Sequence, residues 1–279
     1  MPLKIGSSAI DGISISIKAP YKKTKPACLI TQGHTGIPFA KLYIFSIFAN
    51  IFVEGGDMKY QDYEVAFSSA RLSKYVMACG GDTTAALTLY RSNIQLCQKF
   101  YGLLNVFEVV LRNAINEHFR LYYSDSDWIC NQLGKGGLLE SYPQSNLVRQ
   151  TITTLLASRR YTNDRVVSSV SLGFWTYLFT KVPYQRGGRS LLQIFPLKSK
   201  GLGQRAIFNE LQSIKSFRNR IAHHEAICFD STGAKSTTPA KDYYALILKY
   251  VRFLGYDESH LFYGLNVLPD KVLHKIDTL

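Results

Sequence analysis

The sequence has few cysteines and lacks the paired spacings that build zinc sites or disulfide frameworks. Five cysteines occur among 279 residues, at Cys28, Cys79, Cys97, Cys130 and Cys228, and none forms a CxxC pair. An odd number of widely spaced cysteines argues against a zinc knuckle and favours a protein that works in a reducing compartment.

A hydrophobic run long enough to cross a membrane is also missing. The one apolar run, LYIFSIFANIFV at 42–53, has twelve residues, whereas a membrane-spanning helix needs about 20. The first forty residues mix Lys, Pro and Gly and do not resemble a secretory signal. We therefore expect a soluble, cytoplasmic protein without a membrane partner.

Acidic residues are scarce compared with basic ones. The chain has 20 Asp and Glu against 33 Lys and Arg, a net charge of +13. Its 46% hydrophobic and 13% aromatic content is that of a globular protein rather than a disordered one. The positive excess favours a polyanion such as RNA, DNA or an anionic membrane face, without identifying it. Residues 1–57 hold six lysines and three acids, so +10 of the charge belongs to the rest of the chain.

No run of strand-like, period-two alternation is long enough for a sheet core, so we predict an all-α fold with one main bundle. The first helices are expected to end at Cys79-Gly80-Gly81, and Asp82 is the predicted N-cap of the longest helix. The segments 181–203 and 229–240 are expected to be connections, and the end of the chain after 256 a loose tail. Helices are predicted over 58–93 (two or three short ones), 84–123, 146–161, 164–179, about 204–225 and 241–256.

Residues 1–57 differ from the rest of the chain. They are rich in Gly, Ser, Pro and Lys and show no sustained periodicity. We hypothesise that they are an upstream extension from a misassigned start codon, with Met58 as the true start. The alternative is a poorly ordered tail with one amphipathic piece that packs on the body.

The stretch FRNRIAHHEAI at 217–227 carries the first candidate site. On a helical wheel, Arg220 and His224 fall on a sector expected to be solvated, near a helix C-terminus that favours cations. Arg218, Asn219 and His223 can instead converge at the rim of the core. The buried stripe of this helix is predicted to consist of Ile207, Leu211, Ile214, Phe217 and Ile221.

This trio has the chemistry needed to act on a phosphodiester. Arg218 offers a planar, permanently charged fork, His223 can transfer a proton near neutral pH, and Asn219 can orient either one. RNA could be cleaved without a metal or cofactor, because its own 2′-OH is the nucleophile. One histidine cannot readily act as both base and acid, so a second copy across a dimer or a second motif is expected. The alternative is a structural network without activity.

A metal site is not expected here. His224-Glu225 lacks a second His four residues on, so the HExxH zinc pattern is absent, and Cys228 alone does not supply a site.

A second motif, FEVVLRNAINEHF at 107–119, repeats an Arg-Asn pair followed by His118. Glu108 and Arg112 stand four residues apart and could simply form a salt bridge on the helix surface. Alternatively, Glu108, Arg112 and Asn113 line the same polar cavity as the first motif. In that case the two helices would pack side by side.

Both motifs carry a resemblance to a known family. FRNRIAHHE resembles the R-x4-6-H signature of the HEPN superfamily, and its surroundings are similar to the Abi-like abortive infection proteins of the AbiD and AbiF type. The resemblance covers about 58–255. It rests on four segments in the expected order: ARLSKYVMACGGDTTAALTLYRSN, FEVVLRNAINEHF, SLGFWTYLF and SIKSFRNRIAHHEAI.

The resemblance implies a HEPN-like helical bundle with extra helices, often a homodimer, over 58–279. It further implies a metal-independent endoribonuclease used in phage defence, in which Arg218 holds the scissile phosphate and His223 acts as base or acid. Asn219 occupies the polar position beside the arginine, and the products would carry a 2′,3′-cyclic phosphate. An antitoxin or a small non-coding RNA would be a further partner. The alternative is a HEPN-type module that binds RNA or a partner without turnover.

Overall fold

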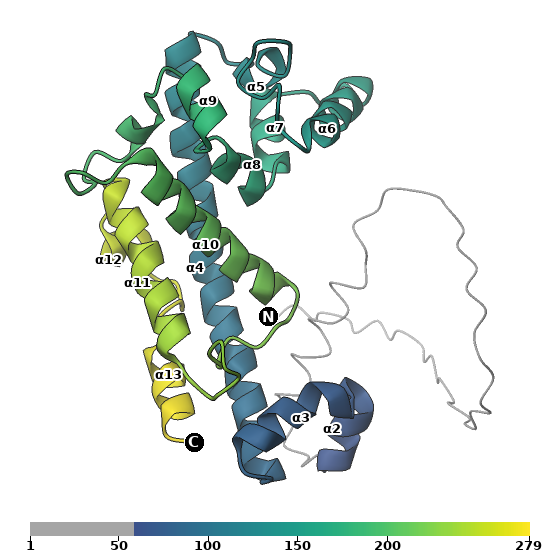
Figure 1. Cartoon of the computed structure of the whole chain (residues 1–279). Coiled ribbons are helices and arrows are strands. Elements are labelled where there is room, and N and C mark those ends of the chain that lie inside the picture. The colour runs from purple at the N-terminus through teal and green to yellow at the C-terminus, as the bar shows by residue number, and fades with distance from the viewer. Residues whose placement is uncertain (1–58) are drawn as a thin grey trace, which may run out of the picture. The chain divides into compact units, whose positions relative to one another are not determined.

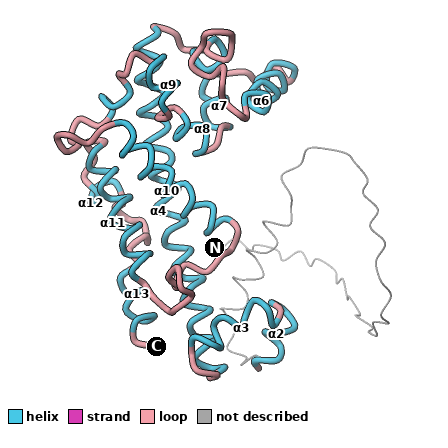
Figure 2. The backbone as a smooth tube through the Cα atoms, viewed as in Figure 1, coloured by secondary structure: helices cyan, strands magenta, loops and turns pink. Residues whose placement is uncertain are grey.

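The computed structural model describes residues 59–279, so both hypotheses on residues 1–57 lie outside the described residues. Over 59–279 the chain forms helices and loops and no strand, apart from an isolated bridge between Phe229 and Lys235. Figure 2 shows this helical content along the backbone. The predicted all-α fold is confirmed.

One long helix organises the structure. α4 (Thr83–Tyr123) has 41 residues and is therefore about 60 Å long. It begins where the sequence predicts, because the Asp82 side chain accepts hydrogen bonds from the amides of Thr84 and Ala85. Its buried residues recur every three or four positions, so one stripe of α4 faces the rest of the fold along its whole length.

The other helices pack on successive parts of α4. Two of them, α2 (Tyr60–Phe67) and α3 (Ser69–Ala78), contact its N-terminal end. In Figure 1, α10 (Gln204–Ala222) crosses α4, with α11 (Thr238–Phe253) beside both. Shorter elements lie toward the C-terminal end of α4: α5 (Trp128–Asn131), α6 (Ser145–Ala157), α7 (Asn163–Ser169), α8 (Leu172–Tyr177), α9 (Lys181–Arg186) and the 3-10 helix η1 (Leu191–Ile194). Of these, α5, α8 and η1 contact α4.

Large aromatic side chains fill the core around that half. Trp128, Phe174 and Trp175 are fully buried, and Trp128 lies 4.9 Å from the ring of Phe119 on α4. α8 packs against α10, and a Cβ atom added at Gly173 would meet Lys215 of α10 at an ordinary contact distance of 3.8 Å.

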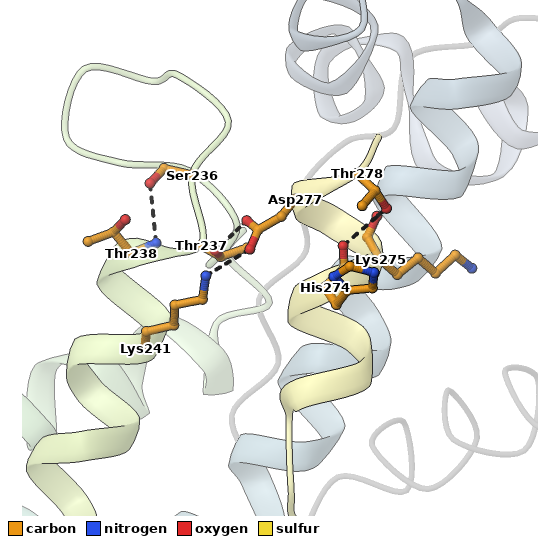
Figure 3. Close-up of polar contacts among 8 residues, drawn as sticks. All are labelled: Ser236, Thr237, Thr238, Lys241, His274, Lys275, Asp277 and Thr278. Carbon is orange, nitrogen blue, oxygen red and sulfur yellow. Dashed lines mark hydrogen bonds and ion pairs between the residues drawn. The ribbon is translucent and has the colours of Figure 1, made fainter.

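The C-terminal segment is helical rather than a loose tail, which corrects the prediction. It forms α12 (Glu258–Leu261) and α13 (Asp270–Asp277), and α13 buries Leu273 and Ile276 against the body. Figure 3 shows the polar contacts between the end of α13 and the start of α11. The Asp277 carboxylate accepts hydrogen bonds from Thr237 and, at 2.7 Å, from Lys241.

Two other helix predictions are wrong in detail. The predicted helix 164–179 is two helices, because Val170 adopts an extended conformation with ψ 145° and separates α7 from α8. The predicted connection 181–203 contains α9, which packs against α10, and η1, which packs against α4.

Candidate functional site

Arg218 and Asn219 are positioned by the buried residue before them. The Phe217 ring packs edge-on against Phe100 of α4 at 4.9 Å and stacks on Tyr243 of α11 at 4.1 Å. These contacts fix the rotation of α10 about its axis, so the next two side chains emerge at the rim of the core. All five residues of the predicted stripe are buried, which confirms the predicted face of this helix.

Both side chains line a hollow of about 310 Å³ between α10, α8 and the loop before α6, which we call the Arg218 hollow. Besides Arg218, its positive charge comes from Lys215, one turn earlier on α10. No Asp or Glu is among the described residues that line it. The lining also includes polar side chains, of which the hydroxyls of Tyr142, Thr176 and Thr180 already donate within the protein. The others are Gln144, Ser171, Tyr177 and Gln212.

Glu108 reaches this site from α4. Its Oε2 atom lies 3.8 Å from the Nε atom of Arg218, with side-chain exposures of 19% and 41%. This distance is too long for a hydrogen bond, so the contact is a loose ion pair that a competing anion could displace. α4 and α10 do pack against each other, as the alternative of a shared polar cavity requires. The salt bridge considered between Glu108 and Arg112 does not form among the described residues.

Arg112 lies one turn further along α4 and is half-buried. Its Nε atom is buried without a hydrogen-bond partner, and no carboxylate in the described part of the chain pairs with it. An arginine with a buried donor and no partner carries a desolvation cost that an incoming anion could relieve. Asn113, by contrast, is exposed and makes no hydrogen bond to the other site residues in the described part of the chain.

His118 belongs to the structural core rather than to the site. Its Nε2 atom lies 2.9 Å from the hydroxyl of Ser190, and its ring packs against Phe119. Burial lowers the pKa of His118, which favours the neutral ring.

His223 stands at the end of α10 rather than inside it. The helix ends at Ala222 instead of near residue 225, because His224 adopts a left-handed conformation with φ 60°. The amide of His224 donates to Ile221 O at 3.0 Å and that of Glu225 to Arg220 O at 2.9 Å. These two bonds form a Schellman motif, in which glycine usually takes the left-handed position.

Side chains from three helices hold the turn after His223. Arg71 of α3 donates to the carbonyl of His224, and Arg220 donates to the carbonyl of Ala226 at 2.8 Å. The buried Asn93 of α4 accepts from the amide of Ile227 at 2.9 Å. Sequence reasoning missed Arg71 and Asn93. It placed Arg220 on a solvated face, and this side chain is 37% exposed but also bonds to the turn. The signal that could have revealed Asn93 is its place in the apolar stripe of a long helix.

The His223 ring is exposed and makes no hydrogen bond to any described residue. Its side chain does not bond to Arg218 or Asn219, which face the hollow one turn earlier. The site therefore has two parts: a basic hollow suited to an anion, and a free imidazole at the helix end beside it.

Comparison of the chain with protein-family models, with curated proteins and with solved structures finds no match. Among residues 59–279, no group of three or more His, Cys, Asp and Glu side chains is placed to hold a metal ion. No helix in this range is both long and apolar enough to cross a membrane.

Proposed function

We propose that this chain is a metal-independent endoribonuclease of HEPN type that acts in phage defence, with Arg218, Asn219 and His223 as its catalytic residues. The observation that carries the proposal is the Arg218 hollow. It places an arginine and an amide in a basic recess without a lining carboxylate, one helical turn from an exposed histidine.

The hollow supplies what phosphodiester cleavage needs most, which is stabilisation of negative charge. As the 2′-OH attacks, the phosphorus becomes a phosphorane whose extra charge Arg218 can bind with two parallel hydrogen bonds. Asn219 donates a further hydrogen bond from the same wall. Glu108 keeps the guanidinium near the rim, and Arg112, whose Nε atom has no hydrogen-bond partner among the described residues, carries a second positive charge one turn further along α4.

His223 supplies proton transfer. Its ring is exposed and has no hydrogen bond to a described residue. It can therefore approach the 2′-OH or the leaving oxygen once the RNA lies in the Arg218 hollow. The second proton-transfer group is the His223 of another copy in a homodimer. Light scattering of the full chain is expected to give twice the 31.5 kDa of one chain, and a monomeric mass in an active preparation would contradict the dimer.

The role in phage defence follows from the resemblance to Abi-like proteins, in which shutdown of the host limits phage spread. Uncontrolled cleavage of RNA would harm the host, so an antitoxin or a small non-coding RNA would hold the protein inactive. Cells that carry the wild-type gene should reduce phage plaque counts, and cells that carry the gene for His223→Ala should not.

Incubation of the purified protein with total RNA in EDTA tests the activity. We expect cleavage by the wild type, products with 2′,3′-cyclic phosphates, and loss of cleavage in Arg218→Ala and His223→Ala. Equal cleavage by all three proteins would refute the assignment, because the activity would then come from elsewhere.

A binding module without turnover is the second candidate. It is favoured by the separation of the His223 ring from Arg218 and Asn219, to which no hydrogen bond joins it. In this case RNA would bind, Arg218→Ala would weaken the binding, and no protein would cleave it.

A further inference from the structure

A second, larger hollow adjoins the first. It has a volume of about 710 Å³, and we call it the Arg205 hollow. One wall is α9 with the residues that flank it, and the other is the first turns of α10. Its lining residues are Thr180, Lys181, Tyr184, Gln185, Arg189, Gln204, Arg205, Phe208 and Asn209.

The three cations of this hollow have no counter-charge among the described residues. Lys181, Arg189 and Arg205 are exposed, and no ion pair joins any of them to a carboxylate in the part of the chain that the structure describes. The lining residues within 59–279 include no Asp or Glu. Arg189 adopts a left-handed conformation with φ 58°, which is uncommon for a residue other than glycine. Three unpaired cations around one recess create a local positive potential suited to a polyanion.

The two hollows are continuous along α10. They share Thr180 and Phe208, and the half-buried Phe208 ring lies at their junction. The lining residues of α10 recur every three or four positions from Arg205 to Asn219, so they form one face of the helix about 20 Å long. Five cations line this face or the wall opposite it: Lys181, Arg189, Arg205, Lys215 and Arg218.

Aromatic rings line the same groove. Tyr184 and Phe208 lie in the Arg205 hollow, and Tyr142 and Tyr177 in the Arg218 hollow. Tyr184, Phe208 and Tyr177 are only half-buried, so part of each ring faces the groove. Positive charge that follows a backbone, combined with rings on which bases can stack, is the pattern of a surface for single-stranded nucleic acid.

We propose that the two hollows form one groove for single-stranded RNA, in which the Arg205 hollow holds nucleotides that flank the phosphate bound at Arg218. This inference rests on the proposed function of the Arg218 hollow and adds a separate subsite to it. Lys181, Arg189 and Arg205 bind phosphates of the strand, and Phe208 stacks on a base where the two hollows meet.

Binding measured without cleavage tests the groove. All proteins carry His223→Ala, and fluorescence anisotropy follows a labelled single-stranded RNA of about 16 nucleotides and a labelled dinucleotide. The test variant is Arg189→Gln with Arg205→Gln. The matched control is Lys271→Gln with Lys275→Gln on α13, which removes the same charge from two exposed lysines without an ion pair among the described residues. In Figure 3 the Lys275 side chain extends away from the bonds that join α13 to α11.

The test variant should bind the long RNA about tenfold or more weakly than the control does, while both bind the dinucleotide alike. The slope of log K against log salt should fall by about 1.4, or 0.7 for each lost phosphate contact. Equal affinities of the test variant and the control for the long RNA would overturn the subsite. If the arginine substitutions weakened binding of a duplex of the same sequence equally, the preference of the groove for a single strand would be overturned.

Phe208→Leu provides a second, independent test. It keeps an apolar side chain at the junction but removes the ring, so it should weaken binding of the long RNA and leave its salt slope unchanged. An unchanged affinity would remove Phe208 from the proposal. Loss of binding in the arginine variant, without RNA cleavage by the wild type, would support the groove while refuting the nuclease. Cleavage by the wild type, together with equal RNA binding by the arginine variant and the lysine control, would support the nuclease and refute the groove.

Discussion

The two adjacent histidines at the end of α10 have different roles. His223 is the C-cap of α10, and its exposed ring makes no hydrogen bond to a described residue. His224 adopts the left-handed conformation that turns the chain away. The main-chain carbonyl of His224, not its ring, receives the hydrogen bond from Arg71. The imidazole of His224 is therefore dispensable for the turn, and only its backbone is needed.

Replacing His224 by glycine should stabilise the protein. A left-handed residue with a side chain costs roughly 1–2 kcal/mol, of which the extra flexibility of glycine in the unfolded chain cancels about 0.5–1 kcal/mol. His224→Gly should therefore raise the free energy of unfolding in urea by about 0.5 kcal/mol. His223→Gly is the control, because its φ of −89° is open to any residue, and it should lower stability. Equal effects of the two changes would show that the turn is unstrained.

For single residues, the sequence predicts which side chains are buried and which emerge at the site wherever helical spacing alone determines their positions. The buried face of α10 follows from its apolar period, and Arg218 and Asn219 emerge beside it as expected. Spacing could not predict the position of His223, because the left-handed residue after it ends the helix early. Asn113 shows the same limit, since a motif that looks like the first one leaves this side chain exposed.

Helices far apart in the sequence meet at the turn after α10. The hydrogen bond from Ile227 to Asn93 is buried and joins this turn to α4. We expect Asn93→Ala to lower the free energy of unfolding by about 1–3 kcal/mol, because the amide of Ile227 would be left buried without a partner. Asn105→Ala is the control on the same helix, since Asn105 is exposed. Hydrogen exchange at Ile227 should also accelerate in the first variant alone, and an unchanged exchange rate would contradict this role.

The contact between α11 and α13 should depend on pH. Hydrogen bonds from Lys241 and Thr237 hold the pKa of Asp277 below its usual value. A depressed pKa in the folded state means that this stabilisation is complete above the unfolded pKa near 3.9 and is lost as pH falls through the lower folded pKa.

Asp277→Asn should therefore lower the free energy of unfolding by about 1 kcal/mol at pH 7, since the pair is largely exposed, and by progressively less as pH falls through the lowered folded pKa. Urea unfolding at a series of pH values measures this difference. Asp242→Asn, at an exposed residue without an ion pair among the described residues, is the control. A cost independent of pH would mean that the carboxylate charge is not involved.

The sequence predicts long helices better than short ones. α4 and α11 have many apolar positions, so their periodicity is clear, and Asp82 marks where α4 begins. α9 and α12 have six and four residues, too few for a period to emerge. These short helices are stabilised by contacts with other parts of the chain, which local spacing does not record.

At the scale of the whole molecule, part of the positive charge is gathered in one region. Residues 58–279 contain 27 Lys and Arg, and five of them line the two hollows next to α10. The net charge of the sequence predicts a polyanionic partner but not this location. Lys181 and Arg189 come from a segment expected to be a plain connection, so only the fold brings them opposite Arg205.

The most direct test of the central claim compares the two histidines by the same substitution. His223→Asn and His224→Asn each remove one imidazole, and asparagine tolerates the left-handed conformation at position 224. Initial rates of cleavage of one single-stranded RNA in EDTA are measured for both and for the wild type. We predict that His223→Asn loses at least about 100-fold in rate, as expected for loss of a general acid or base, and that His224→Asn stays within about twofold of the wild type. Equal rates for the two variants, or no cleavage by the wild type, would contradict the assignment of His223 as a catalytic residue.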